Sequence, residues 1–240
     1  MGLEIVTRAS DSPWIAAVWT SRSDAVSQMT SVASETWGLV FWEQDGVSHA
    51  AVTGPETRTS SAAVPEGAVF SGIQFAVGTS LRATPTSGLV DSGIGLPDTT
   101  ERHFRLLGDR WETPGPDDAE ALVDRLVRSG VVERDPLVAA ALRGGGVPGS
   151  DRTVERRFRA ATGLTRGAID QISRARTATT LLLGGATAAA VVADLGYYDE
   201  PHLARALRRY VGRTAGQLRS GTGGALALGA ESPTAQRTTS

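Results

Sequence analysis

The chain has 240 residues, of which 40% are hydrophobic and 21% charged, a composition typical of a folded protein with one large or two ordinary domains. It contains no cysteine, which excludes disulfide scaffolds, cysteine-ligated metal sites and catalytic thiols. The net charge of −2 hides an asymmetry, because residues 1–149 carry 11 arginines and 19 acidic residues, whereas residues 150–219 carry 12 arginines and six acidic residues. An acidic front half therefore precedes a basic back half.

The front half is predicted to be rich in β-structure. Residues 37–42 and 47–53 flank Asp45-Gly46, a dipeptide typical of two-residue hairpin turns. Apolar residues at alternate positions between Val69 and Val77 predict another strand with one buried face. We expect an antiparallel sheet or a small barrel here, followed by an all-α domain, which places the protein in the α+β class.

The hydrophobic period becomes helical after a predicted linker at residues 113–116. Asp117 and Glu120 resemble a capping box at the start of a helix. Helical spacing then continues to about Arg219, whereas residues 220–240 contain little that could be buried and are predicted to be a disordered tail. The predicted domains are therefore residues 1–113, residues 114–219 and the tail 220–240.

An internal repeat with an offset of 49 residues aligns residues 154–163 with residues 203–212. Gly163 aligns with Gly212, and Ser150 aligns with Asp199, both good helix N-caps. Each copy predicts an amphipathic helix that ends at glycine. A short apolar helix and a glycine-containing turn precede each copy, which is the plan of a helix-turn-helix unit. Residues 166–183, between the copies, could form a helix of about 27 Å.

The same residues carry a family resemblance. The matching segments are residues 152–158, 161–163, 174–178, 181–182, 196–203, 208–214 and 217–219. Over roughly residues 117–219 the chain resembles the DNA-binding domain of AraC/XylS-type transcriptional regulators. It departs from their pattern in the glycine-rich segment 144–149 and at Val192. The resemblance implies two helix-turn-helix units joined by one long helix, whose recognition helices read major-groove segments about 34 Å apart.

The resemblance also assigns DNA contacts by position. Base-edge contacts are expected from Arg152, Glu155, Arg156, Glu200, Ala204 and Arg205. Phosphate contacts are expected from Arg159, Arg208 and Arg209. Arginine can bond guanine through two donors and a carboxylate can accept from cytosine, whereas phosphate contacts fix the register without reading sequence. Arg174 and Arg176 on the connecting helix are expected to pair with acidic residues instead.

All five tryptophans lie in the front half. They could form a hydrophobic core or an aromatic pocket for a small molecule, and both interpretations remain open. In the resembling family the front domain typically senses an effector or dimerises. The candidate effector-binding residues are Trp37, Trp42 and Phe75.

Other chemistry finds little support in the sequence. Gly144, Gly146 and Gly149 match the spacing of a dinucleotide fingerprint, but that motif requires a preceding strand, where a helix is predicted. The three histidines lack metal-ligand spacing, and no nucleophile motif accompanies them. We therefore expect no metal, cofactor or enzymatic activity; the alternative is a small-molecule-binding enzyme or carrier that binds DNA non-specifically.

The expected partners follow from this interpretation. They are double-stranded DNA, a small-molecule effector, a second copy of the chain in a homodimer and, for an activator, RNA polymerase. The first 20 residues lack a targeting signal, and no apolar run reaches the ~20 residues of a membrane span. We therefore expect a cytoplasmic, nucleoid-associated protein without membrane contact.

Overall fold

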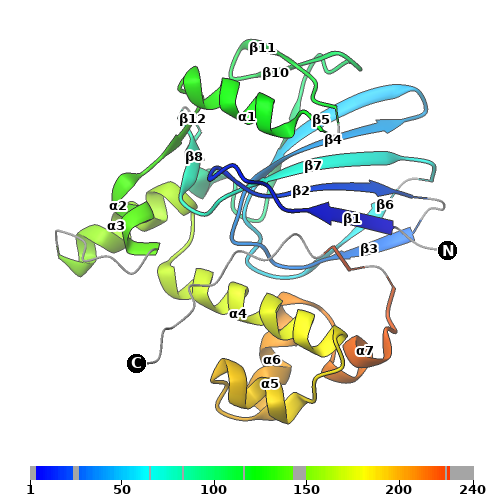
Figure 1. Ribbon diagram of the computed structural model, residues 1–240, viewed down its shortest axis with the longest axis vertical. Coiled ribbons are helices and arrows are strands. Elements are labelled where there is room, and N and C mark those ends of the chain that lie inside the picture. The colour runs from blue at the N-terminus through cyan, green and yellow to red at the C-terminus, as the bar shows by residue number, and fades with distance from the viewer. Residues whose placement is uncertain are drawn as a thin grey trace.

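Six antiparallel strands form the main sheet of the computed structural model, in the order β1-β2-β7-β4-β5-β9 (Figure 1). The structure describes residues 4–23, 27–64, 66–82, 84–115, 117–142, 150–224 and 226–227. The strands of the main sheet are β1 (Glu4–Arg8), β2 (Ile15–Arg22), β4 (Gly38–Gln44), β5 (Val47–Thr53), β7 (Val69–Phe75) and β9 (Gly93–Leu96). The predicted hairpin is confirmed: β4 pairs with β5, and Asp45 and Gly46 have φ of 52° and 74°, as a two-residue type I′ turn requires.

Three smaller sheets accompany the main one. β3 (Ser27–Ser31) lies between β6 (Ser60–Val64) and β13 (Leu226–Ala227), while β8 (Thr79–Leu81) pairs with β12 (Val132–Arg134). β10 (His103–Leu106) and β11 (Asp109–Glu112) form a hairpin. β13 falls within the segment predicted as a tail, of which residues 228–240 lie outside the described part of the chain.

Successive side chains along each strand point to opposite sides of the main sheet, and the two faces differ in character. On one face Leu39, Phe41 and Phe75 are buried in a core that also contains Phe104 of β10 and Leu122 of α1 (Ala119–Arg128). Figure 1 shows α1 and the β10–β11 hairpin over one side of the sheet and β3 and β6 on the other. The face toward β3 and β6 is hollowed into a cavity rather than filled.

The back half is helical, so the α+β arrangement is confirmed. After α1 come α2 (Pro136–Leu142), α3 (Asp151–Thr162), α4 (Arg166–Leu183), α5 (Ala188–Leu195), α6 (Glu200–Tyr210) and α7 (Ala215–Ser220). The connecting helix predicted for residues 166–183 is α4. Among the described residues, no helix is both long and apolar enough to cross a membrane.

The first of these helices departs from the sequence prediction. The N-cap of α1 is Asp118, whose side chain makes no capping hydrogen bond, so the capping box predicted at Asp117 and Glu120 is wrong. Instead, Arg8 Nη1 and Nη2 donate to the Glu120 carboxylate at 2.6 and 2.9 Å. This pair ties α1 to β1, and α1 buries its apolar face in the core of the front half.

A second hydrophobic core unites the helices from α2 onward. It includes Phe158 of α3, Ile172 of α4 and Leu207 of α6, and it also takes in Val32 and Ala33 of the front half. The segment between β3 and β4 is therefore part of the packing of the helical half.

Candidate DNA-binding surface and ligand cavity

The first predicted recognition helix, α3, is fixed at both ends by local interactions. The Ser150 side chain accepts a hydrogen bond from the backbone N–H of Thr153, which confirms the predicted N-cap. The helix ends at Gly163, whose φ of 76° is left-handed. Phe158 is completely buried, which confirms the predicted apolar stripe of this helix.

The opposite side of α3 presents arginines. Arg152, Arg156 and Arg159 are exposed, and with the half-buried Glu155 and Ser87 of the 3-10 turn η1 (Thr86–Gly88) they line a depression. Within the described residues, none of these three arginines forms an ion pair with a carboxylate. Their guanidinium groups are therefore available to bind an anion such as a phosphate.

Arg157 of the same helix has a different role. Its guanidinium contacts Asp135 Oδ2 at 2.9 Å, and Asp135 Oδ1 accepts from the backbone N–H of Leu137 at the start of α2. Arg157 therefore holds α3 against α2. Among the described residues Arg156 therefore has no carboxylate partner, whereas its neighbour Arg157 has a structural role.

The second predicted recognition helix, α6, repeats the features of the first. Asp199 caps it by accepting from the backbone N–H of His202 at 2.7 Å, as the repeat predicts. Leu203, Leu207 and Tyr210 are buried. The residues predicted to contact DNA, Glu200, Ala204, Arg205, Arg208 and Arg209, are all exposed. Arg209 lies over the ring of Tyr210, with its Cζ 5.1 Å from the ring centroid.

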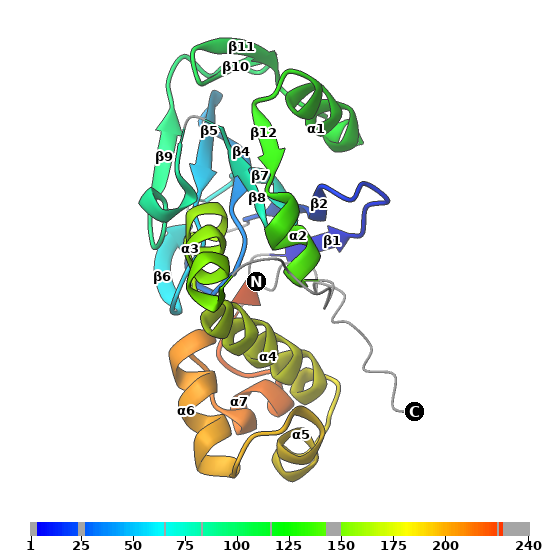
Figure 2. The same cartoon turned by 90° about the vertical axis from the view of Figure 1, so that its left-hand side faces the viewer.

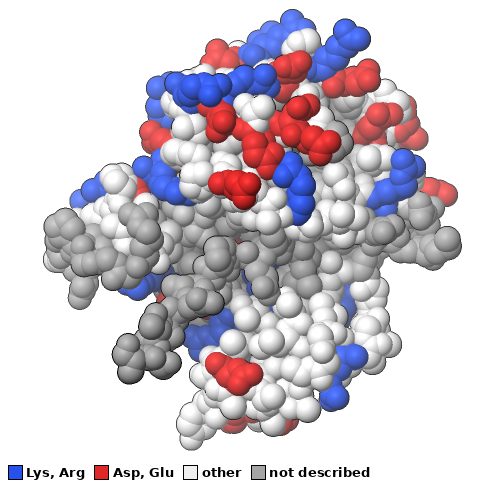
Figure 3. Space-filling model, in the orientation of Figure 1, with Lys and Arg blue, Asp and Glu red and all other residues white. Residues whose placement is uncertain are grey.

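Helices α3 and α6 lie one above the other in Figure 2, with the start of α4 between them. α5, the left-handed Gly196 and α6 form a helix-turn-helix unit. The corresponding turn between α2 and α3, together with Gly144, Gly146 and Gly149, lies in residues 143–149, outside the described residues. On the face drawn in Figure 3, acidic and basic side chains mix over α1 and the β10–β11 hairpin, an arrangement that does not suit a polyanion.

The connecting helix carries two arginines with different surroundings. Arg176 is 6% exposed, lies 4.0 Å from a Glu35 carboxylate oxygen and donates to the backbone oxygen of Ala33 at 3.3 Å. Its expected pairing with an acid is therefore confirmed. Arg174 instead lies over the ring of Tyr197, at 5.5 Å from the centroid, and burial raises the pKa of that tyrosine to about 12.

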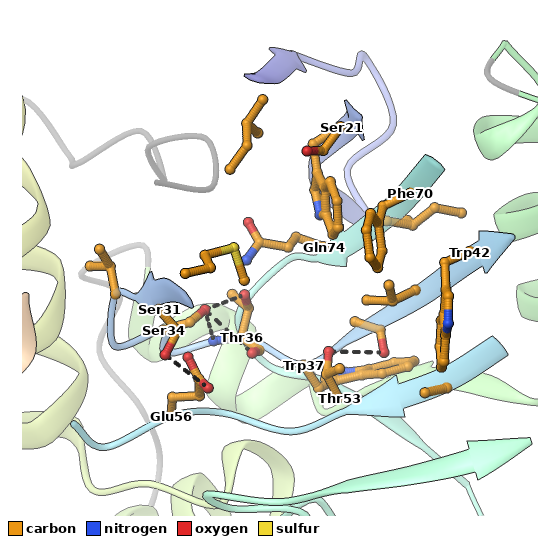
Figure 4. A pocket seen from close by; sticks show the side chains of 18 of the residues that line it. Ser21, Ser31, Ser34, Thr36, Trp37, Trp42, Thr53, Glu56, Phe70 and Gln74 are labelled. Atoms are coloured by element: carbon orange, nitrogen blue, oxygen red, sulfur yellow. Dashed lines mark hydrogen bonds between the residues drawn. The ribbon is translucent and has the colours of Figure 1, made fainter. Parts of the chain in front are cut away.

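A cavity of about 580 Å³ lies between the main sheet and strands β3 and β6 (Figure 4). Its aromatic lining consists of Trp19, Trp37, Trp42 and Phe70. Trp19 lies over Gly72, where a Cβ atom would stand only 2.2 Å from Cε2 of the indole ring. Glycine at this position therefore allows the indole ring to lie directly against the sheet.

The three predicted effector-binding residues occupy different positions. Trp37 and Trp42 line the cavity. Phe75 is completely buried and stacks behind Trp37, with ring centroids 3.9 Å apart and planes 7° apart. Trp19 and Phe70, which line the cavity, were not predicted, because only the pairing of β2 and β4 with β7 brings them together with Trp42.

The other end of the cavity is polar. Ser31, Ser34, Thr36 and Glu56 lie together there in Figure 4, and Arg176 of α4 completes the wall. Ser31 Oγ donates to Glu56 Oε1 at 3.3 Å. Burial raises the pKa of Glu56 above its ordinary value and the charge of Asp91 adds to this, while the Ser31 hydrogen bond and Arg176 oppose it.

The segments that carry the polar wall also contact α6 through their backbone. The N–H of Ala33 donates to the oxygen of Tyr210 at 2.8 Å, and the N–H of Thr59 donates to the oxygen of Arg209 at 3.0 Å. Both acceptors belong to the last turn of α6. These segments beside the cavity therefore hold the end of α6.

Comparison with known proteins agrees with this geometry. Residues 149–221 match a protein-family model described as a helix-turn-helix domain, and the matched range runs from α3 to α7. No curated protein and no solved structure matches the chain significantly. Residues 149–221 therefore form an AraC/XylS-type helix-turn-helix domain, which supports a role for this part of the chain in binding DNA and regulating transcription.

Proposed function

We propose that the protein reads DNA with both α3 and α6, and that a small molecule in the cavity of the front half controls this binding. The observation that carries the proposal is the shared wall: the segment between Ser31 and Thr36 lines the cavity and is bonded to both α6 and α4. A ligand against this wall would touch the structure that holds the second recognition helix.

The proposed contacts with DNA rest on the exposed side chains of the two helices. Arg156 and Arg205 occupy equivalent positions of the repeat and are both exposed, which suits bonding to guanine in two major-groove segments. Arg159 and Arg208 are also equivalent and exposed, and they lie further along each helix, where phosphate contact would set the register.

The proposed control follows from linkage. A ligand changes DNA affinity only if its own affinity differs between the free and the DNA-bound arrangement, and such coupling is typically about 1–3 kcal/mol. Movement of Ala33 would displace the end of α6 through the Tyr210 hydrogen bond and would also disturb the bond from Arg176 of α4. The spacing between α3 and α6 would then change, and with it the fit to two groove segments.

Selection from a random DNA library with the full chain would provide the operator sequence. The affinity for that operator should fall steeply with salt, because arginines that neutralise phosphates release counterions. A logarithmic plot of affinity against salt that stays flat would contradict the proposed contacts. Control by a ligand is tested by reciprocity: an effector must bind with a different affinity when operator is present. A ligand that binds equally in both cases would leave the front half as a dimerisation domain.

A further inference from the structure

We infer that the cavity takes a flat, hydrophobic organic cation, such as an aromatic amine, with its rings among the aromatic side chains and its charge toward Glu56. This inference rests on the proposed function only in treating the cavity as a ligand site. It names the chemical class of the ligand and the residue that selects it.

The aromatic end of the cavity suits a flat ring system. Trp42 and Phe70 have nearly parallel rings, with planes 22° apart and centroids 6.4 Å apart. Trp19 lies against the sheet over Gly72 on the same face. The faces of aromatic rings attract cations as well as apolar groups, so this lining favours a positively charged aromatic molecule over a negatively charged one.

The polar end carries more negative than positive charge. Glu35, Glu56 and Asp91 gather around it, whereas Arg176 is the only base that lines the described part of the cavity. Arg176 is already engaged by Glu35 and by the backbone oxygen of Ala33. Among the described residues Glu56 forms no ion pair of its own, and burial disfavours its ionised form. A cation placed beside Glu56 would supply a counter-charge, while an anion would be repelled.

A buried hydroxyl group provides a second, independent indication of a ligand. Ser21 is 6% exposed and lines the aromatic end of the cavity (Figure 4). Among the described residues its Oγ has no hydrogen-bond partner. Buried hydroxyl groups are normally satisfied, so an unpaired one in a cavity wall marks a position where a ligand group or water can bond. A ligand with a polar substituent at the end distant from its cation would satisfy it.

Three probes of one shape test the inference: 2-naphthylmethylamine, 2-naphthylmethanol and 2-naphthoate, titrated into the full chain by calorimetry at neutral pH. We expect the amine to bind about tenfold more tightly than the alcohol, as ring attraction and a partly buried ion pair together allow, and the carboxylate to bind most weakly. Naphthoate as the tightest ligand, or no binding by any probe, would overturn the inference. This ranking in the wild-type protein requires no variant to fold.

The variant Glu56→Gln keeps the shape of the side chain and removes its charge. The amine should lose its advantage over the alcohol, while the alcohol binds as before. Glu43→Gln is the matched control, because Glu43 is an exposed carboxylate of β4 that does not line the cavity. An equal loss for amine and alcohol in Glu56→Gln would overturn the role of Glu56 in selection. If the amine binds with the expected Glu56 dependence but leaves operator affinity unchanged, the ligand class stands and the proposed control of DNA binding fails.

Discussion

Helices α3 and α6 show how one repeated sequence acquires two different environments. Both are capped by a polar side chain, bury one apolar stripe and end near a left-handed glycine. Gly163 at the end of α3 lies against Val90 and the backbone of Thr86, whereas Gly212 after α6 lies against Thr59 and Thr30. The repeat therefore determines the local structure of each helix, and the front half distinguishes the two by contacting each at its final glycine.

The largest expected effect is the loss of stability when a buried apolar residue of either helix is truncated. Phe158 in α3 and Leu207 in α6 are equivalent in the repeat, and both are completely buried. Phe158→Ala should lower the free energy of unfolding by about 3–5 kcal/mol, and Leu207→Ala by about 2–5 kcal/mol, because each leaves a cavity in the same core. Urea unfolding of both variants measures this. An unchanged midpoint for either would mean that its stripe does not support the core.

Substitution of the glycines that follow α3 and α6 tests how closely the front half contacts each helix end. Gly163→Ala should cost about 2–4 kcal/mol, because it combines a left-handed backbone with a Cβ only 3.0 Å from the backbone oxygen of Thr86. Gly212→Ala should cost less, since its nearest neighbour is the side-chain oxygen of Thr59, at 2.9 Å. Gly196→Ala is the control: it is left-handed but has nothing within 4 Å, so only about 1–2 kcal/mol is expected. An equal loss of stability in thermal unfolding for all three variants would show that contacts with the front half do not restrict these glycines.

The two helices should differ in which base pairs they read, whereas the loss of discrimination on substitution should be similar for both. Arg156→Ala and Arg205→Ala should each reduce discrimination by roughly 1–3 kcal/mol, at base pairs about one helical turn apart. Binding to a library of operator variants measures this preference. Arg157→Ala is the matched control, since its guanidinium is engaged by Asp135 and should not read bases. Should Arg156→Ala and Arg205→Ala weaken binding equally on every sequence, both would be phosphate contacts.

Features of the fold that are determined by local interactions were predictable from the sequence. The N-caps Ser150 and Asp199, the left-handed Gly163 and the bounds of α4 all depend on residues within a turn or two of each other. The exposed arginines of both helices follow from the same periodicity. Their number and spacing were therefore predictable once the repeat was recognised.

The rest depends on contacts between distant segments. Trp19 joins Trp42 in one cavity only because β2 and β4 flank β7 in a fixed register, which no local pattern reveals. Arg176 reaches Glu35 across more than half of the chain. Glu120 resembled a capping residue because its spacing from Asp117 fits that motif, yet it accepts hydrogen bonds from Arg8 on strand β1. Strand order and long-range ion pairs thus determine which residues line the cavity. Neither can be predicted from a short segment of the sequence.

The smallest expected effect concerns that last ion pair, which fastens α1 to the front half. The hydrogen bond from Arg8 lowers the pKa of Glu120 to about 2, although burial opposes this shift. A carboxylate with a lowered pKa stabilises the folded state above its ordinary pKa, and this contribution disappears as the pH falls from about 4.5 toward 2. Both side chains are about one-third exposed, so solvent screening limits the pair to about 0–1 kcal/mol. Unfolding free energies of wild type and Glu120→Gln should therefore differ slightly at pH 7 and converge near pH 2. A difference that persists at low pH would mean that Glu120 supports α1 through packing rather than through its charge, and the helix would then be held to the front half by its apolar face alone.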